Sequence, residues 1–313
     1  MSAYPTFLIS HRVADITFQT EADVEIPHIL EPSFARFQVA NSRADVVYQI
    51  RELDPKALPL PPLNERERTQ LLRAVGFPKQ WLDRPALNNP EVRKKIEVCL
   101  DYPELAHIGL RWERVIISNF FHNELDYFYP PDKKSDFADP LMHARYRNSL
   151  ARFMPNFAAV MLHGAGVIRN DMAVLFMAPD EGGKSSVIRL AEGMPVLSDD
   201  QIILRRQNGV VHAYGTPFAP VSNGPLRSKL GGIFLLEKSS HFALSSISIS
   251  EALQFIWKEQ IHHWFLMPKT LRVMAFELIA DACRQAKLFR VQFPKDHMDW
   301  KAIDKALAGG KEY

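Results

Sequence analysis

The chain has 313 residues, enough for one large α/β domain or about two domains of average size. Hydrophobic residues make up 47% and charged residues 24%, a balance that excludes a disordered, collagen-like or coiled-coil chain. Lysine and arginine number 38 against 36 aspartates and glutamates, so the net charge of +2 gives no bulk attraction to nucleic acid or to a membrane, and we expect neither as a partner.

The cysteine content and the N-terminal segment bear on the cellular compartment. Cys99 and Cys283 cannot form a multi-bridge disulfide framework and lack the paired spacing of a metal site, so we expect two small buried side chains. The N-terminus lacks the basic start and long apolar run of a secretory signal. No window approaches the ~18 apolar residues of a membrane-spanning helix. These features predict a cytoplasmic protein.

Short β-favouring segments open the chain and are separated by acidic and proline-containing turns, at residues 6–9, 14–20 and 44–50. A proline-rich stretch at 58–63 then gives way to helical patterning. Asn64 is the predicted N-cap of one helix, and Asn89 followed by Pro90 marks the start of a second helix that ends near Leu100. Strand patterning returns at residues 115–118 and 127–129.

The segment 129–140 divides the chain into two predicted domains. It contains three prolines and a run of solvated charges, which is typical of a linker. We predict a β-rich N-terminal domain over residues 1–135 with a helical insertion near 64–105. A second domain is predicted over residues 141–313. The mixture of strands and helices indicates the α/β class in its mixed, α+β form.

A strand–loop–helix pattern at residues 173–186, AVLFMAPDEGGKSS, carries the strongest chemical signal. Its five leading apolar residues are typical of a strand buried on both faces. The loop ends in Gly183, Lys184 and Ser185, after which helical spacing follows. The pattern is a Walker A sequence in which Ala178 replaces the first glycine.

Phosphate binding is the chemistry of such a loop. Backbone N–H groups at the loop and the helix start attract phosphate oxygens. Lys184 would place its charge on the β- and γ-phosphates, and Ser185 would offer its hydroxyl to Mg²⁺. The alternative is a tight strand-to-helix turn with a surface lysine. The predicted nucleotide-binding residues are Ala178, Pro179, Asp180, Glu181, Gly182, Gly183, Lys184, Ser185 and Ser186.

An acidic pair follows within a second apolar segment, VLSDDQIIL. Asp199 and Asp200 have apolar residues on both sides, so they interrupt a strand. The intervening helix, at 1.5 Å per residue, is just long enough for a crossover that returns the chain beside the phosphate loop. Carboxylates there would hold Mg²⁺ or accept a proton from an attacking hydroxyl. The alternative is a bulge or turn with two solvated acids.

Three motifs in this order resemble the catalytic domain of HPr kinase-type and HPr-kinase-related proteins: His163 followed by GAGV, then AVLFMAPDEGGKSS, then VLSDDQIIL. The resemblance covers residues 155–236. It implies a phosphoenolpyruvate-carboxykinase-like P-loop fold and Mg²⁺-dependent transfer of phosphate from ATP to a serine hydroxyl. It also implies that Asp199 is the general base, that Asp200 and Ser185 hold the metal, and that His163 lines the site. The order of the two aspartates stays open.

We therefore predict an ATP- and Mg²⁺-dependent kinase that phosphorylates a serine or other hydroxyl of a protein or peptide. Asp180 and Glu181 depart from the family, which has a small residue and then glycine there. Acids beside a triphosphate are unfavourable unless they point outward or act through a cation. A catalytically degenerate nucleotide- or peptide-binding module and a small-molecule kinase are the alternatives. The sequence leaves a homo-oligomer open.

Overall fold

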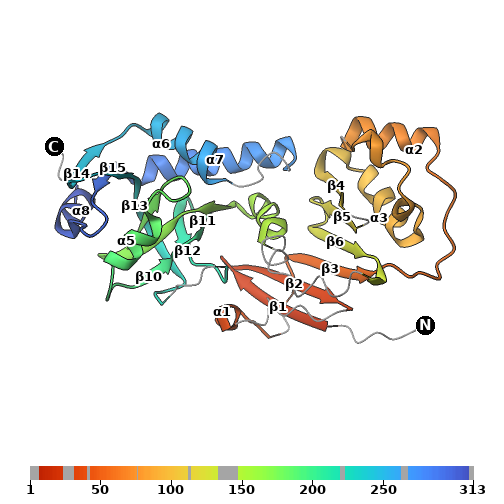
Figure 1. The fold of residues 1–313 in the computed structure, drawn as a ribbon, viewed down its shortest axis with the longest axis horizontal. Helices are drawn as coiled ribbons and strands as arrows, with labels where there is room; N and C mark the ends of the chain where they lie inside the picture. The colour runs from red at the N-terminus through yellow and green to blue at the C-terminus, as the bar shows by residue number, and fades with distance from the viewer. Residues whose placement is uncertain are drawn as a thin grey trace. The chain divides into compact units, whose positions relative to one another are not determined.

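The computed structural model describes residues 7–23, 32–40, 43–75, 77–111, 114–132, 147–218, 223–261 and 267–309. It is a mixed α/β structure with two separate sheets, one in each of two compact units (Figure 1). Unit 1 comprises residues 1–153 and 265–270, and unit 2 comprises residues 154–264 and 271–313. Most of the expected linker, from residue 133 onward, lies outside the described residues. None of the described helices has the length and apolar character needed to cross a membrane.

Unit 1 is built on a six-stranded sheet in the order β1-β2-β3-β6-β5-β4. Strand β2 pairs in parallel with β3, and β3 with β6, whereas the other neighbours are antiparallel. Ala14 and Asp15 both have positive φ and form the β1–β2 turn, so β2 begins two residues later than expected. The strands are β1 (Phe7–Val13), β2 (Ile16–Ala22), β3 (Val46–Glu52), β4 (Ala106–Arg111), β5 (Arg114–Asn119) and β6 (Glu124–Tyr129), with a short helix α1 (Pro32–Ala35) after β2.

A helical insertion lies between β3 and β4, as the sequence predicts. Asn64 and Glu67 form a reciprocal capping box, with N···O distances of 3.0 and 2.7 Å. The Asn89 side chain caps the next helix at the position the sequence indicates. Both predicted helix starts are therefore confirmed. The elements are α2 (Glu65–Gln70), η2 (Leu71–Val75), η3 (Lys79–Trp81), η4 (Pro85–Asn88), α3 (Pro90–Leu100) and η5 (Pro103–Leu105).

Unit 2 contains a nine-stranded sheet whose main path runs β10-β8-β9-β13-β12-β11-β7. The long strand β13 pairs in parallel with β9 and β15 and antiparallel with β12, and β14 pairs with β15. The strands are β7 (Ala159–His163), β8 (Ala165–Arg169), β9 (Met172–Met177), β10 (Val196–Ser198), β11 (Gln201–Gln207), β12 (Val210–Tyr214), β13 (Arg227–Lys238), β14 (Ala243–Ser246) and β15 (Lys287–Phe293).

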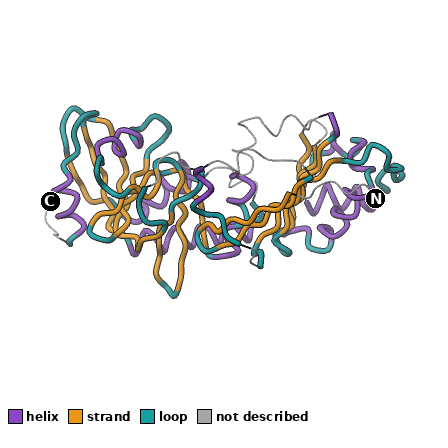
Figure 2. The backbone as a smooth tube through the Cα atoms, turned by 90° about the horizontal axis from the view of Figure 1, so that it is seen from below, coloured by secondary structure: helices purple, strands orange, loops and turns teal. Residues whose placement is uncertain are grey.

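Helices cover both faces of β9 (Figures 1 and 2). Leu175 and Met177 pack into one core with α6 (Ile249–Phe255), the π-helical segment η8 (Ile256–Gln260) and α7 (Lys269–Gln285). Val174 and Phe176 pack into a second core with α5 (Lys184–Leu190) and α8 (Trp300–Leu307). The continuous apolar run predicts this double burial, which is confirmed. A 3-10 turn, η7 (Met154–Phe157), precedes β7.

The crossover after the loop between β9 and α5 differs from the prediction. Strand β10 does not lie beside β9, because β8 intervenes. Asn170 and Asp171, both with positive φ, close a tight β8–β9 hairpin that occupies one edge of β9. Strand β13 occupies the other edge, so β10 pairs with the outer edge of β8. The acidic pair after β10 therefore approaches the loop across one intervening strand.

Candidate functional site

The loop between β9 and α5 has a geometry that depends on glycine. Gly183 is the N-cap of α5 and has a φ of 105°. A Cβ on Gly182 would lie 2.5 Å from the Ala178 Cβ and 2.9 Å from the Pro179 carbonyl oxygen, so only glycine fits there. Glu181 has a φ of 60°, a left-handed conformation that costs a non-glycine residue free energy. The loop thus folds back tightly on its own start.

Lys184 is buried beneath this loop. Only 8% of its surface is exposed, which rules out the surface lysine of the alternative interpretation. Its Nζ donates hydrogen bonds to the carbonyl oxygens of Ala178 at 2.8 Å and Pro179 at 3.1 Å. Burial lowers the pKa of Lys184, and the charges of Asp180 and Asp200 oppose that shift. The lysine therefore lies within the field of both acids.

Asp199 and Asp200 form a two-residue bend, here called the acidic turn, between β10 and β11. Ser198 pairs with Gly166 and Gln201 with His163 in one continuous antiparallel register, so the two half-buried acids interrupt a strand, as the sequence predicts. The Ser198 side chain holds the acidic turn in place. Its Oγ donates to the Gln201 carbonyl oxygen at 2.6 Å and accepts from the Gln201 backbone N–H at 3.2 Å. The Gly164 amide donates to the Asp200 carbonyl oxygen at 2.9 Å. This bond joins the acidic turn to Gly164, the single residue between β7 and β8.

His163, the last residue of β7, connects the acidic turn to the β9–α5 loop. Its Nδ1 lies 3.1 Å from the Asp200 Oδ1, and its Nε2 lies 3.2 Å from the Asp180 Oδ1. The side-chain Nε2 of Gln201 also donates to the Asp200 Oδ2 at 3.2 Å. The imidazole ring therefore lies between an acid of the β9–α5 loop and an acid of the acidic turn. The Asp180 side chain is 87% exposed, so this loop acid faces solvent and the histidine.

The structure thus brings most of the predicted residues together. His163 contacts both Asp180 of the loop and Asp200, and Asp199 precedes Asp200 in the acidic turn. Ser185 lies exposed in the first turn of α5, and Ser186 follows it half-buried.

Two residues of the site carry no signal in the sequence. Gln260, at the end of η8, donates from its Nε2 to the Ala178 carbonyl oxygen at 3.1 Å. The Phe293 ring lies so close to Gly183 that a Cβ there would be 2.9 Å from the Phe293 Cζ. A lone glutamine on a helix and an aromatic residue in an apolar strand are common features of folded proteins. Only the requirement for glycine at 183 hints at a close neighbour.

The oxygen donors present suit a magnesium ion that arrives with a nucleotide. Among the described residues, no three or more histidine, cysteine, aspartate or glutamate side chains form a metal-binding cluster. Mg²⁺ usually takes one or two protein oxygens and fills its octahedron with waters and phosphate oxygens. The hydroxyl of Ser185 and the carboxylate of Asp200 are donors of that kind. The residues therefore fit a nucleotide-borne ion and do not form a protein-only cage.

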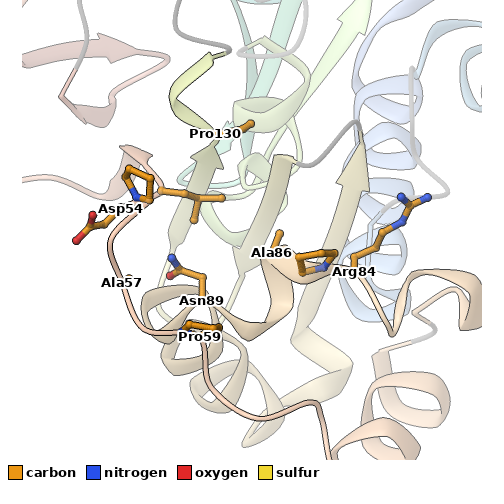
Figure 3. A pocket seen from close by; sticks show the side chains of 10 residues that line it. Asp54, Ala57, Pro59, Arg84, Ala86, Asn89 and Pro130 are labelled. Atoms are coloured by element: carbon orange, nitrogen blue, oxygen red, sulfur yellow. The ribbon is translucent and has the colours of Figure 1, made fainter.

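Unit 1 holds a separate cavity of about 430 Å³. Figure 3 shows Asn89 between Asp54 on one side and Arg84 on the other. Asn89 has a structural role here, since its Oδ1 caps α3. None of the predicted site residues lines this cavity. Its lining is mostly apolar and includes four prolines: Leu53, Asp54, Pro55, Ala57, Pro59, Arg84, Pro85, Ala86, Asn89 and Pro130.

No protein-family model and no curated protein matches the chain. One of the solved structures that match is the HPr(Ser) kinase/phosphatase from Coxiella burnetii. The two sequences are 11% identical, and the match covers 47% of this chain and 93% of that chain with a TM-score of 0.25. At this TM-score the likeness does not establish a shared fold or activity.

Proposed function

We propose that unit 2 is a P-loop kinase domain of the HPr kinase type that transfers the γ-phosphate of Mg-ATP to a serine hydroxyl of a protein or peptide. One observation carries this proposal. The buried ammonium of Lys184 is held by two loop carbonyls within the field of Asp180 and Asp200. A buried cation, a glycine-dependent loop and an acidic turn are the parts that phosphoryl transfer needs.

The loop would bind the phosphates through its backbone N–H groups, and Lys184 would exchange the two carbonyls for phosphate oxygens. Ser185 and Asp200 would hold the magnesium ion, which when bound neutralises phosphate charge. His163 would orient the Asp200 carboxylate through the 3.1 Å contact. These residues bind and position the nucleotide, and such positioning accounts for most of the catalysis in this reaction.

Asp199 would act on the acceptor. It would take the proton of the serine hydroxyl as the serine oxygen forms a bond to the γ-phosphorus and the bond from that phosphorus to ADP breaks. Its half-buried position beside Asp200 leaves it accessible to an acceptor. Asp199 and Asp200 thus have different tasks although they are neighbours, because His163 contacts Asp200.

The outward direction of the two loop acids supports ATP as a ligand of this loop. Asp180 is 87% exposed and contacts His163, and Glu181 is also exposed. Carboxylates in water are screened, so their repulsion of a triphosphate is weaker than the sequence suggests. The unusual loop is therefore compatible with ATP.

A transfer assay with γ-labelled ATP, Mg²⁺ and a positional-scanning library of serine peptides tests the proposal. We expect label in the peptides, and none in a matching library with alanine in place of serine. Lys184→Ala and Asp199→Asn should abolish transfer. The control variants are Lys301→Ala, an exposed residue of α8, and Asp171→Asn in the β8–β9 turn, and both should transfer label at the wild-type rate.

The outcomes separate the candidate functions. ATP binding without label transfer to the peptides, or to a panel of small-molecule alcohols, would identify a degenerate binding module. Label on the alcohols alone would identify a small-molecule kinase. Full transfer by a folded Asp199→Asn protein would refute the role assigned to Asp199.

A further inference from the structure

The two carbonyls that hold Lys184 each have a second hydrogen-bond donor. The Pro179 carbonyl oxygen accepts from the Gly182 amide at 3.0 Å as well as from Lys184. The Ala178 carbonyl oxygen accepts from the Gln260 Nε2 at 3.1 Å as well as from Lys184. The first extra donor is local and belongs to the loop turn. The second comes from a side chain 82 residues further along the chain.

A π-helical segment places Gln260 for this contact. Gln260 ends the π-helical segment η8, which continues α6. Such segments are rare and occur often at functional sites. The side chain is fully buried, and its Oε1 has no hydrogen-bond partner among the described residues. A buried polar atom without a hydrogen-bond partner lowers the stability of the folded protein. An apolar side chain at this position would avoid that cost, so the Nε2 contact of Gln260 is the feature that a glutamine adds here.

We propose that Gln260 is a positioning residue that keeps the Ala178 carbonyl oxygen hydrogen-bonded when Lys184 leaves it for a phosphate. This inference rests on the phosphate-binding role proposed for the loop. Moving the ammonium to a ligand would otherwise leave a buried acceptor unpaired at the end of β9. With Gln260 and the Gly182 amide in place, both carbonyls stay satisfied, so the lysine is released without that penalty.

Loss of the Gln260 donor should therefore hold Lys184 more tightly in the ligand-free protein. Among the described residues, the lysine would then be the only side chain that donates to the Ala178 carbonyl oxygen. An amine held more firmly against that oxygen leaves its buried position less often, so an acylating reagent reaches it less often.

Competitive labelling of lysines with acetic anhydride, read by mass spectrometry, tests this without nucleotide. Gln260→Met should slow acetylation of Lys184 by about threefold, the effect of a modest hydrogen-bond preference. Gln260→Leu removes the donor with a second apolar shape and adds no charge, and it should slow the reaction as well. If the methionine variant does not fold, the leucine variant decides the result. An unchanged or faster reaction would overturn the proposal.

Two control variants separate positioning from ordinary packing. Ile256→Val removes one buried methyl from the same segment η8 and should not change Lys184 labelling at matched thermal stability. Gln285→Met removes a side chain that bridges Gly209 and Val211 elsewhere in unit 2, and it should also have no effect. If either control slows Lys184 labelling as much as Gln260→Met, the role assigned to Gln260 is wrong.

Mg-ATP titration adds a second readout. Gln260→Met should raise the dissociation constant by about tenfold, because the lysine now leaves an unpaired carbonyl behind. Wild-type affinity in this variant would count against the inference. If the wild-type protein does not bind Mg-ATP at all, the proposed function fails, and the labelling experiment still decides the role of Gln260.

Discussion

Replacement of Gly183 by alanine measures how far the phosphate loop depends on its glycine. Two separate costs apply at this position. The φ of 105° is one that residues with a Cβ rarely adopt. The new Cβ would also lie 2.9 Å from the Cζ of Phe293, inside van der Waals contact. A second glycine, Gly193, has a φ of 80° but no described atom within 4 Å of the position of its Cβ, so it carries the first cost alone.

The magnitudes follow from these two terms. A left-handed backbone conformation costs a non-glycine residue about 1–2 kcal/mol. Inserting a methyl group into a packed site costs about 1–3 kcal/mol more. Gly183→Ala should therefore lower the free energy of unfolding by about 2–5 kcal/mol, and Gly193→Ala by about 1–2 kcal/mol. Enlarging the space with Phe293→Leu should recover part of the loss in the double variant Gly183→Ala/Phe293→Leu.

Urea unfolding followed by circular dichroism gives the stabilities, and hydrogen exchange of residues 178–190 localises the effect to the loop and α5. Mg-ATP titration of the same variants should show weaker binding for Gly183→Ala and wild-type binding for Gly193→Ala. Equal stability losses in the two single variants, or no coupling between Gly183 and Phe293, would refute the reasoning from the ring contact.

Three further predictions concern unit 1. Burial raises the pKa of Asp126 to about 6 in spite of the 3.0 Å ion pair with Lys95. Because the pKa of Asp126 in the folded protein exceeds the ordinary value of 3.8, the protonated carboxyl contributes stability that is lost as the pH rises from about 4 to 6. The urea midpoint of the wild-type protein should therefore fall over this pH range, and the midpoint of Asp126→Asn should not. Arg93 is buried and its Nη1 lies 3.1 Å from the Glu67 Oε1, so Arg93→Met should cost about 3 kcal/mol in urea unfolding; a loss below about 1 kcal/mol would contradict this. Burial raises the pKa of the Cys99 thiol to about 12, so the folded protein should leave Cys99 unlabelled by iodoacetamide at pH 8, and rapid labelling would show that it is accessible.

The features that the sequence predicts well are local ones. Asn64 and Asn89 cap their helices because a cap depends on three or four consecutive residues. The loop at 178–183 follows from a continuous apolar run, two glycines and a lysine. Its glycine requirement at 182 arises within the loop itself, from contacts to Ala178 and Pro179. Patterns of this length can be recognised in a single chain.

The features that it misses depend on pairing over long distances. Nothing in the run of residues around His163 indicates that its ring lies between Asp180 and Asp200. Strand β10 lies outside β8 because the β8–β9 hairpin occupies one edge of β9 and β13 occupies the other. Strand β13 begins only at Arg227, far from β9 in the sequence. Gln260 reaches the loop only because α6 and η8 pack beside β9. These contacts follow from sheet order, which periodicity does not determine.

Titration calorimetry of Mg-ATP, with the wild-type protein beside Lys184→Ala, tests the central claim most directly. The exposed-lysine variant Lys301→Ala is the control. We predict that the wild-type protein and the control bind Mg-ATP alike, and that Lys184→Ala loses at least about tenfold in affinity, as expected when a charge-assisted contact to phosphate is removed. Undiminished binding by folded Lys184→Ala, or no binding by the wild-type protein, would contradict this claim.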